Sequence, residues 1–153
     1  MRILVVAKYL FYLYAWLWCL RRRRAETTSD ILKLFYLDFL KLDKRDVEVV
    51  KLDEHELVTR CRNSCPILKL SIKLKIDTKL ACKVVSEPVC KYVLHKLNSR
   101  LVFERNYNHI RPYAESCEER IYFVQKIGRI VSSRSSPTTI CLNTPPLCKY
   151  SST

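Results

Sequence analysis

Glycine is almost missing from this chain of 153 residues, in which Gly128 is the only one. The phosphate-binding loops of P-loop proteins and of dinucleotide-binding domains need glycines, because a residue without a Cβ lets the backbone turn tightly and approach a phosphate closely. The sequence therefore excludes a P-loop and a Gly-x-Gly-x-x-Gly site. Kinase and dinucleotide-dependent functions built on these loops are excluded with them.

Acidic residues are absent from both ends of the chain. Residues 1–24 carry six basic groups and residues 125–153 carry four, so ten of the thirteen net positive charges lie at the ends. A protein that reads nucleic acid concentrates basic groups on its folded face, whereas the lysines of the middle region are spaced like those of a solvated face. Binding to nucleic acid is therefore the weakest functional hypothesis.

Cysteine is plentiful, with eight residues at positions 19, 61, 65, 82, 90, 117, 141 and 148. Eight cysteines could form four disulfides, but a secreted disulfide framework needs an export signal and is usually small and rich in loops. The middle of this chain has helix-like and strand-like patterns instead. This composition favours free thiols in a reducing, cytoplasmic compartment.

The N-terminal segment "ILVVAKYLFYLYAWLWCL", residues 3–20, carries one charge, Lys8, and is followed by "RRRR" at 21–24. A helix of this length is about 27 Å long, close to the thickness of a bilayer core. The arginines would hold their side in the cytoplasm, and their position after the apolar run argues against a cleaved signal peptide. Aromatic side chains crowd the segment, which suits a membrane interface better than a bilayer centre. Two interpretations of this segment remain open. Either residues 3–20 associate with a membrane, or the segment forms a strand followed by a buried aromatic helix.

The other end, residues 125–153, is rich in Ser, Thr and Pro and shows no apolar periodicity. Such a segment cannot bury enough apolar surface to offset the entropy of ordering it, so a disordered tail is expected. The chain thus divides into an apolar, basic-ended segment over 1–24, a cysteine-containing domain over 25–124, and this tail.

Apolar periodicity in the middle region predicts a mixture of helices and strands. The expected elements are a helix over about 30–42 capped by Ser29 or Asp30, two strands joined at Asp53–Glu54, a helix from Thr78 that Pro88 kinks or splits, a strand over 100–107, and a strand or short helix over 117–124. Because these elements do not alternate as regular β–α–β units, the expected class is α+β, with antiparallel strands in one small domain.

One segment gives conflicting signals. From Leu68 to Ile76 an apolar residue fills every even position, and this period of two predicts a strand. Directly before it, Cys65 is followed by Pro66, and proline is favoured at the first position of a helix.

Three stretches carry a resemblance to a known family: "NSCPILKLSIKLKIDTKLACK", "NSRLVFERNY" and "IRPYAESCEE". In order and spacing the chain resembles the L-2-amino-thiazoline-4-carboxylic acid hydrolase family over about residues 45–121, with Cys65, Cys82 and Cys117 at the family's cysteine positions. The resemblance implies a helix over 68–76, a small carboxylate-bearing ligand and, for an enzyme, hydrolysis of a C–N bond in a cyclic amidine. Lys75 and Tyr113–Ala114 stand where or near where glycines are usual, so whether catalysis survives remains open.

If the implied helix forms, Cys65 is its N-cap, where backbone N–H groups and the helix dipole would stabilise a thiolate. Arg60 and Arg62 would add to this effect, so Cys65 is the candidate nucleophile. An attack on an amidine also needs an acid and a base. His109 and Glu115, with Glu118 as a further candidate, are the residues proposed for that role, and Arg111 is proposed to bind the substrate carboxylate.

The competing hypothesis is a cysteine-based metal or redox sensor, tethered to a membrane by residues 3–20. Cys61 and Cys65, with Cys82 and Cys117, could form a four-cysteine zinc site, although strong zinc signals come as two tight pairs. Cys61 and Cys65 could instead form a reversible disulfide. For Cys82 and Cys90 a third interpretation is open, because a buried cysteine on an apolar helical face behaves as a small hydrophobic residue.

Overall fold

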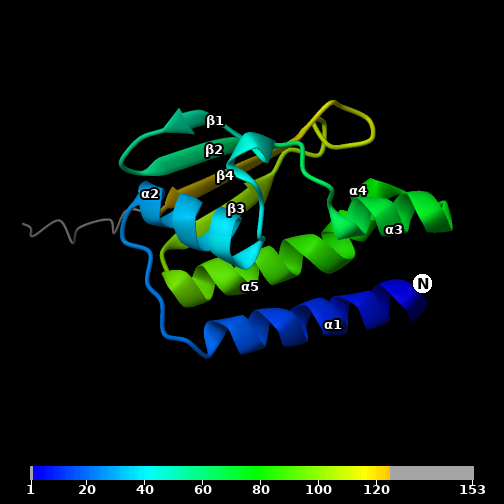
Figure 1. Cartoon of the computed structure of the whole chain (residues 1–153), viewed down its shortest axis with the longest axis horizontal. Coiled ribbons are helices and arrows are strands. Elements are labelled where there is room, and N and C mark those ends of the chain that lie inside the picture. Colours follow the sequence, from blue (N-terminus) through cyan, green and yellow to red (C-terminus); the bar gives the residue numbers. More distant parts are fainter. Residues whose placement is uncertain (1, 125–153) are drawn as a thin grey trace, which may run out of the picture.

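An antiparallel sheet and a set of helices make up the computed structural model, which describes residues 2–124 (Figure 1). The sheet has the strand order β1-β2-β4-β3, formed by β1 (Val47–Leu52), β2 (Glu56–Cys61), β3 (Leu101–Arg105) and β4 (Cys117–Phe123). The α+β prediction is confirmed, and residues 117–123 are a strand. The predicted tail lies outside the described residues.

Helical segments accompany this sheet, most of them on one side of it (Figure 1). They are α1 (Arg2–Cys19), α2 (Thr28–Ile31), the π-helical η1 (Leu32–Phe39), the short 3₁₀ turn η2 (Lys44–Asp46), α3 (Pro66–Leu74), α4 (Thr78–Ala81), the π-helical η3 (Cys82–Ser86) and α5 (Glu87–Leu97). Helix α5 lies between the sheet and α1, and α1 packs against α5 and η3. The molecule is therefore layered, with α1 outermost.

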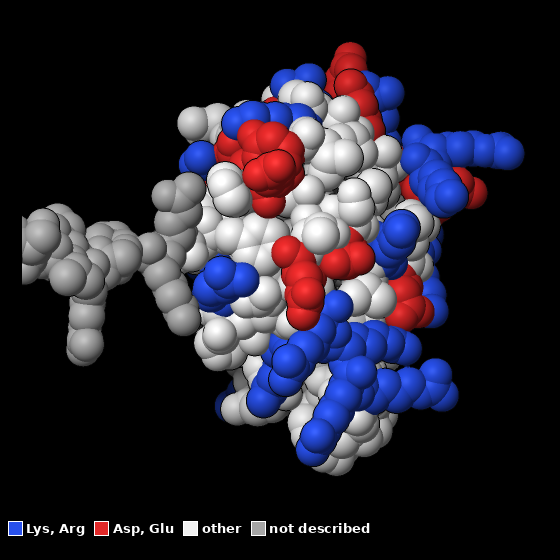
Figure 2. All heavy atoms as spheres, turned by 90° about the vertical axis from the view of Figure 1, so that its left-hand side faces the viewer, with Lys and Arg blue, Asp and Glu red and all other residues white. Residues whose placement is uncertain are grey.

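Helix α1 is largely apolar both where it packs against the domain and where it faces solvent. Leu4 and Ala15 are buried against the rest of the protein, and the Tyr14 hydroxyl donates a hydrogen bond to the Phe39 carbonyl at 2.9 Å. By length and composition this helix near the N-terminus could cross a membrane or serve as a signal sequence. Where α1 ends, Lys and Arg side chains gather on the surface, as Figure 2 shows.

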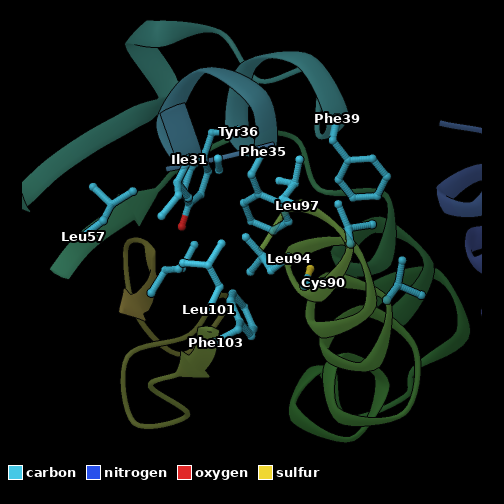
Figure 3. Close-up of a cluster of buried hydrophobic side chains, with 14 of the residues drawn as sticks. Ile31, Phe35, Tyr36, Phe39, Leu57, Cys90, Leu94, Leu97, Leu101 and Phe103 are labelled. Atoms are coloured by element: carbon cyan, nitrogen blue, oxygen red, sulfur yellow. The ribbon is translucent and has the colours of Figure 1, made fainter. Parts of the chain in front are cut away.

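The core lies between the sheet and the layer formed by η1 and α5 (Figure 3). Phe35 of η1 meets Phe103 of β3 edge to face, with ring centroids 6.3 Å apart. Leu94 of α5 and Leu57 of β2 are also fully buried there. Such burial removes about 150–250 Å² per aromatic side chain from water, and it fixes η1 and α5 on the sheet.

Local signals explain where the first helices and strands begin. The helical segment over 28–39 is capped by Thr27, whose hydroxyl accepts from the Asp30 N–H at 3.1 Å, while the Asp30 carboxylate accepts from the Thr27 N–H. The cap is therefore Thr27 and not Ser29 or Asp30, because Asp30 takes the third position of a capping box. The turn between β1 and β2 is held by Asp53, whose carboxylate accepts from the His55 and Glu56 N–H groups.

The segment over 68–76 is a helix and not the strand that its alternation predicted. Helix α3 begins with Pro66 at its first position and Cys65 as N-cap, and it ends at Lys75, which takes a left-handed conformation with φ of 54°. A helix spreads the even positions around its circumference. Leu68 is accordingly buried, whereas Ile72 is 60% exposed.

The helix predicted from Thr78 is divided, but not at Pro88 itself. The wider turns of η3 separate α4 from α5, and Pro88 lies in the first turn of α5. The backbone stays helical through this junction, because the Glu87 N–H donates to the Cys82 carbonyl, so the wider turns of η3 accommodate Pro88. The predicted apolar face is confirmed: Cys82, Val85, Val89, Val93 and Leu97 are all buried.

Candidate functional site

A cavity of about 270 Å³ lies where the inner face of the sheet meets the helices. Its walls come from α1, the end of η1 and the residues after it, the start of α3, and the helical segment η3–α5. Most of this surface is apolar, with Phe11, Phe39, Ile67 and Val89 among the lining side chains. Cavities of this kind are the usual sites for small ligands.

Five cysteines from five segments of the chain line the cavity. Cys61 ends β2 and Cys117 begins β4, and the two are opposite each other in the strand register, so their side chains share one face of the sheet. Cys65 caps α3, Cys82 begins η3 and Cys90 lies in α5. All four cysteines of the predicted cluster are thus brought to one place.

Cys90 is the cysteine that the sequence-based site omitted. It is 3% exposed, and Ser86 lies one turn before it with its Oγ 3.9 Å from the Cys90 sulfur. Its helical spacing from Cys82 was visible in the sequence, but buried apolar neighbours made a packing role the natural interpretation.

A buried ion pair forms the polar part of the cavity wall. The Arg105 Nε donates to Glu119 Oε1 at 3.1 Å, and the two side chains are 5% and 7% exposed. Glu119 also accepts from the Tyr36 hydroxyl at 3.1 Å, and Tyr36 accepts from Thr59 at 2.7 Å. The carboxylate is therefore held by donors on both of its oxygens.

This pair was missed by the sequence analysis, although a signal existed. Arg105 follows Leu101 and Phe103 at alternate positions of β3, and Glu119 lies between Cys117 and Ile121 on β4. A charged residue at an inward position of a strand is costly unless it is paired. The alternation of burial therefore marks both residues as members of a buried polar site.

Arg105, which lines the cavity, retains hydrogen-bonding capacity. Its guanidinium carries five N–H groups; Nε and Nη2 donate to Glu119, and Nη1 donates to Ser86 Oγ at 3.2 Å. These bonds use three of the five, and no acceptor within residues 2–124 is recorded for the other two. Buried donors are nearly always paired, so an acceptor atom of a ligand would suit this place.

Burial raises the pKa of thiols that line the cavity. Removal from water raises the pKa of Cys82 to about 12 and that of Cys90 to about 12, against an ordinary value of 9.0. The same cause raises the pKa of Cys61 and of Cys117. These four side chains are therefore neutral thiols near pH 7.

Cys65 takes the N-cap position that the resemblance implied, with φ of −62° and ψ of 125°, but its thiol accepts no capping hydrogen bond. The arginines expected beside it are paired elsewhere. Arg60 donates to Glu118 at 2.9 Å and Arg62 to Glu48 at 3.2 Å. Activation of Cys65 by these two cations is thus not supported by the geometry.

The other proposed catalytic residues lie outside the cavity lining. His109 pairs with Ser116 Oγ at 3.0 Å, and Glu115 is exposed. Arg111 donates to the Asn63 carbonyl at 2.6 Å, and its backbone N–H donates to the Cys117 sulfur at 3.5 Å. Arg111 therefore ties its loop to the turn before Cys65.

The zinc hypothesis depends on the arrangement of its four cysteines. Cys61, Cys65, Cys82 and Cys117 line one cavity, yet within residues 2–124 no group of three or more His, Cys, Asp or Glu side chains is arranged to hold a metal ion. The described cysteines are free thiols.

Compared with protein-family models, with curated proteins and with solved structures, the chain shows no significant match. The resemblance to the thiazoline-carboxylate hydrolases therefore stays a prediction.

Proposed function

We propose that this protein binds a small, largely apolar, carboxylate-bearing molecule in the cysteine-lined cavity, without hydrolysing it. The observation that carries the proposal is the meeting of five cysteines and the Arg105–Glu119 pair around one apolar cavity. The resemblance to thiazoline-carboxylate hydrolases supports the ligand class. Binding without turnover is favoured because His109 and Glu115 do not line the cavity.

The charge balance of the cavity decides how a carboxylate would be held. Glu119 already neutralises Arg105, so a ligand carboxylate needs a second cation to offset the cost of burial. The exposed Lys41 is the lining residue that could provide it, by exchanging its surface ion pair with Asp38, 3.0 Å away, for the ligand. The two remaining Arg105 N–H groups would then bind the ligand's oxygen atoms.

The experiment is a titration of the full chain with L-2-amino-thiazoline-4-carboxylate and with its neutral carboxamide, followed by NMR of protein and ligand. Saturable binding of both is expected, with the ring intact. Cys65→Phe, which fills the cavity from its half-buried rim, should abolish both interactions. Cys19→Ala is the matched cysteine control, because Cys19 lies outside the cavity lining, and it should change neither.

Lys41→Asn should weaken binding of the carboxylate by about tenfold and spare the carboxamide. Lys75→Asn is its matched control, since Lys75 shares the positive φ of Lys41 but lies outside the lining. The proposal is wrong if neither compound binds saturably, or if Cys65→Phe binds both as well as the parent protein. Opening of the ring would instead make the protein a hydrolase.

A redox sensor is the second candidate, and the strand register favours it. Cys61 and Cys117 are directly opposite each other, and paired residues of antiparallel strands have Cα atoms about 4.5–5.5 Å apart, within the range of disulfides. Oxidised glutathione would take two electrons and the two thiol protons as the bond forms. A mass loss of about 2 Da confined to these cysteines after that treatment, and absent from Cys117→Ala, would support this function over ligand binding.

We also propose a cytoplasmic, membrane-associated location. It is supported by the free thiols, which suit a reducing compartment, and by the apolar helix near the N-terminus. A four-cysteine zinc site remains an alternative that metal analysis of the purified protein would test, with Cys65→Ala and Cys117→Ala as controls.

A further inference from the structure

The outward side of α1 is an apolar surface of unusual extent. Every solvent-exposed residue of this helix except Arg2 is apolar or aromatic, and Tyr9 and Leu10 are 69% and 61% exposed. The exposed large side chains are Ile3, Val5, Val6, Tyr9, Leu10, Leu13, Tyr14, Trp16 and Leu17. At about 100° per residue they cover about half of the helix circumference. We call them the outer face of α1.

A basic cluster adjoins the end of this face. Arg21, Arg22 and Arg24 are exposed, and with Lys96 and Arg100 they line a broad hollow beside the last turn of α1. Figure 2 shows Lys and Arg gathered at this end of the molecule. Arg23 differs from its neighbours, because it stacks on Trp18 and pairs with Asp38 at 3.0 Å.

Resting on the membrane association proposed above, the geometry points to an anionic phospholipid surface as the partner of the outer face of α1, with the helix lying in the plane of the membrane. An interfacial helix buries an apolar face below the headgroups while basic residues contact anionic lipid. Tyr9 and Trp16 are side chains that prefer the headgroup region. The exposed arginines supply the charge complementary to the lipid.

The packing of α1 argues against its spanning the bilayer. Leu4 and Ala15 are buried against the domain, Tyr14 bonds the Phe39 carbonyl, and Phe11 lines the cavity. A spanning orientation would break these contacts and open the core to lipid or water. A second copy of the chain fits less well, because a helix pair needs a narrow seam and the outer face of α1 is about half a cylinder.

The test uses the full chain and vesicles of phosphatidylcholine, either pure or with phosphatidylserine, in a flotation assay. Strong binding to the anionic vesicles and weak binding to the neutral ones are expected. The double variant Leu10→Asp/Leu17→Asp should lose binding, whereas Ile72→Asp, at a residue 60% exposed on α3, should keep it. Salt at 1 M should weaken binding to the anionic vesicles, because it screens contacts with the headgroups.

Two triple variants that have the same net charge as each other test the basic cluster. Arg21→Gln/Arg22→Gln/Arg24→Gln should bind anionic vesicles about a hundredfold more weakly, because each residue near the surface contributes about tenfold or less. The control triple Lys33→Gln/Lys69→Gln/Lys73→Gln removes three exposed charges elsewhere and should bind normally.

The two tryptophans report the orientation of the helix. Trp18→Phe leaves Trp16, which is 51% exposed on the outer face; its fluorescence should shift to the blue on anionic vesicles and be quenched by brominated acyl chains. Trp16→Phe leaves the half-buried Trp18 and should show neither effect. Any one of four results would overturn the inference. They are absence of vesicle binding, equal binding to neutral vesicles, resistance to alkaline carbonate extraction, and a dimer that dissociates in the Leu10→Asp/Leu17→Asp variant.

Discussion

The buried pair of Arg105 and Glu119 is the costliest arrangement of single residues in this fold. Both charges have left water, and the free energy lost in doing so is offset only while each has its partner. The Tyr36 hydroxyl donates to Glu119 and the Ser86 hydroxyl accepts from Arg105, which completes the network. The cavity thus has a fixed polar wall that stays in place without a ligand.

We expect Glu119→Gln to lower the free energy of unfolding by about 3–5 kcal/mol, because it leaves the Arg105 charge buried and unpaired. Urea denaturation followed by circular dichroism measures this change. Glu48→Gln is the matched control: the Glu48–Arg62 pair is 51% and 58% exposed, so a change within about 0.5 kcal/mol is expected. A loss below about 1 kcal/mol for Glu119→Gln would mean that the pair is not buried in solution.

The buried thiols make stability depend on pH in the alkaline range. The pKa of Cys90 rises from 9.0 to about 12 on folding because burial disfavours the thiolate. The folded state therefore keeps its proton above pH 9 while the unfolded chain releases it. This stability is complete below pH 9 and is lost progressively as the pH rises toward 12.

Between pH 9 and 10, we expect the fall in unfolding free energy to be smaller in Cys90→Ala than in the parent protein, by about 1 kcal/mol per pH unit. Urea titrations at pH 8, 9 and 10 provide the comparison. Equal slopes for the two proteins would contradict the buried, protonated state of Cys90.

At the level of elements, the strands and the buried helical face could be predicted because their pattern is local. The alternation in β2 and β3 and the spacing from Cys82 to Leu97 both follow from one segment packing on one core. For α3 the local pattern wrongly predicted a strand, because Lys69, Lys73 and Lys75 alternate with apolar residues in a helix that is only partly buried. The Cys-Pro start was the better signal there.

The end of α3 offers a direct test of backbone conformation. Lys75 has a positive φ of 54°, which is unfavourable for a residue with a Cβ. We expect Lys75→Gly to raise the free energy of unfolding by about 0.5–1 kcal/mol. Lys69→Gly, inside the same helix, should lower it by about 1 kcal/mol. If both variants lose stability in thermal denaturation, Lys75 does not end the helix in this conformation.

The candidate site was harder to predict, because it depends on contacts between distant segments. The facing of Cys61 and Cys117 and the pairing of Arg105 with Glu119 are set by the registers of β2 with β4 and of β3 with β4. A shift of one residue would turn these side chains to the other side of the sheet. No local pattern determines a register between strands that lie far apart in the chain. Cysteine spacing could therefore indicate which thiols matter, but not that an ion pair lies beside them.

For the whole molecule, α1 acts as a cover as well as an outer surface. Phe11 on its inward side and Tyr14 at the edge of the outer face line the cavity, and Ala15 is fully buried where the helix packs on the domain. Ala15 itself is not part of the cavity lining. A change at Ala15 can therefore loosen the cover without altering the cavity's own side chains.

We expect Ala15→Leu to lower the free energy of unfolding by about 1–3 kcal/mol, because the larger side chain pushes α1 away from its packing surface. The same variant should expose Cys82 and Cys90, so that iodoacetamide modifies them faster at pH 8, as measured by mass spectrometry of peptides. Leu13→Ala is the matched control on the same helix: Leu13 is 52% exposed, so stability and labelling should both stay unchanged. Faster labelling in Leu13→Ala, or unchanged labelling in Ala15→Leu, would show that α1 does not cover the cavity.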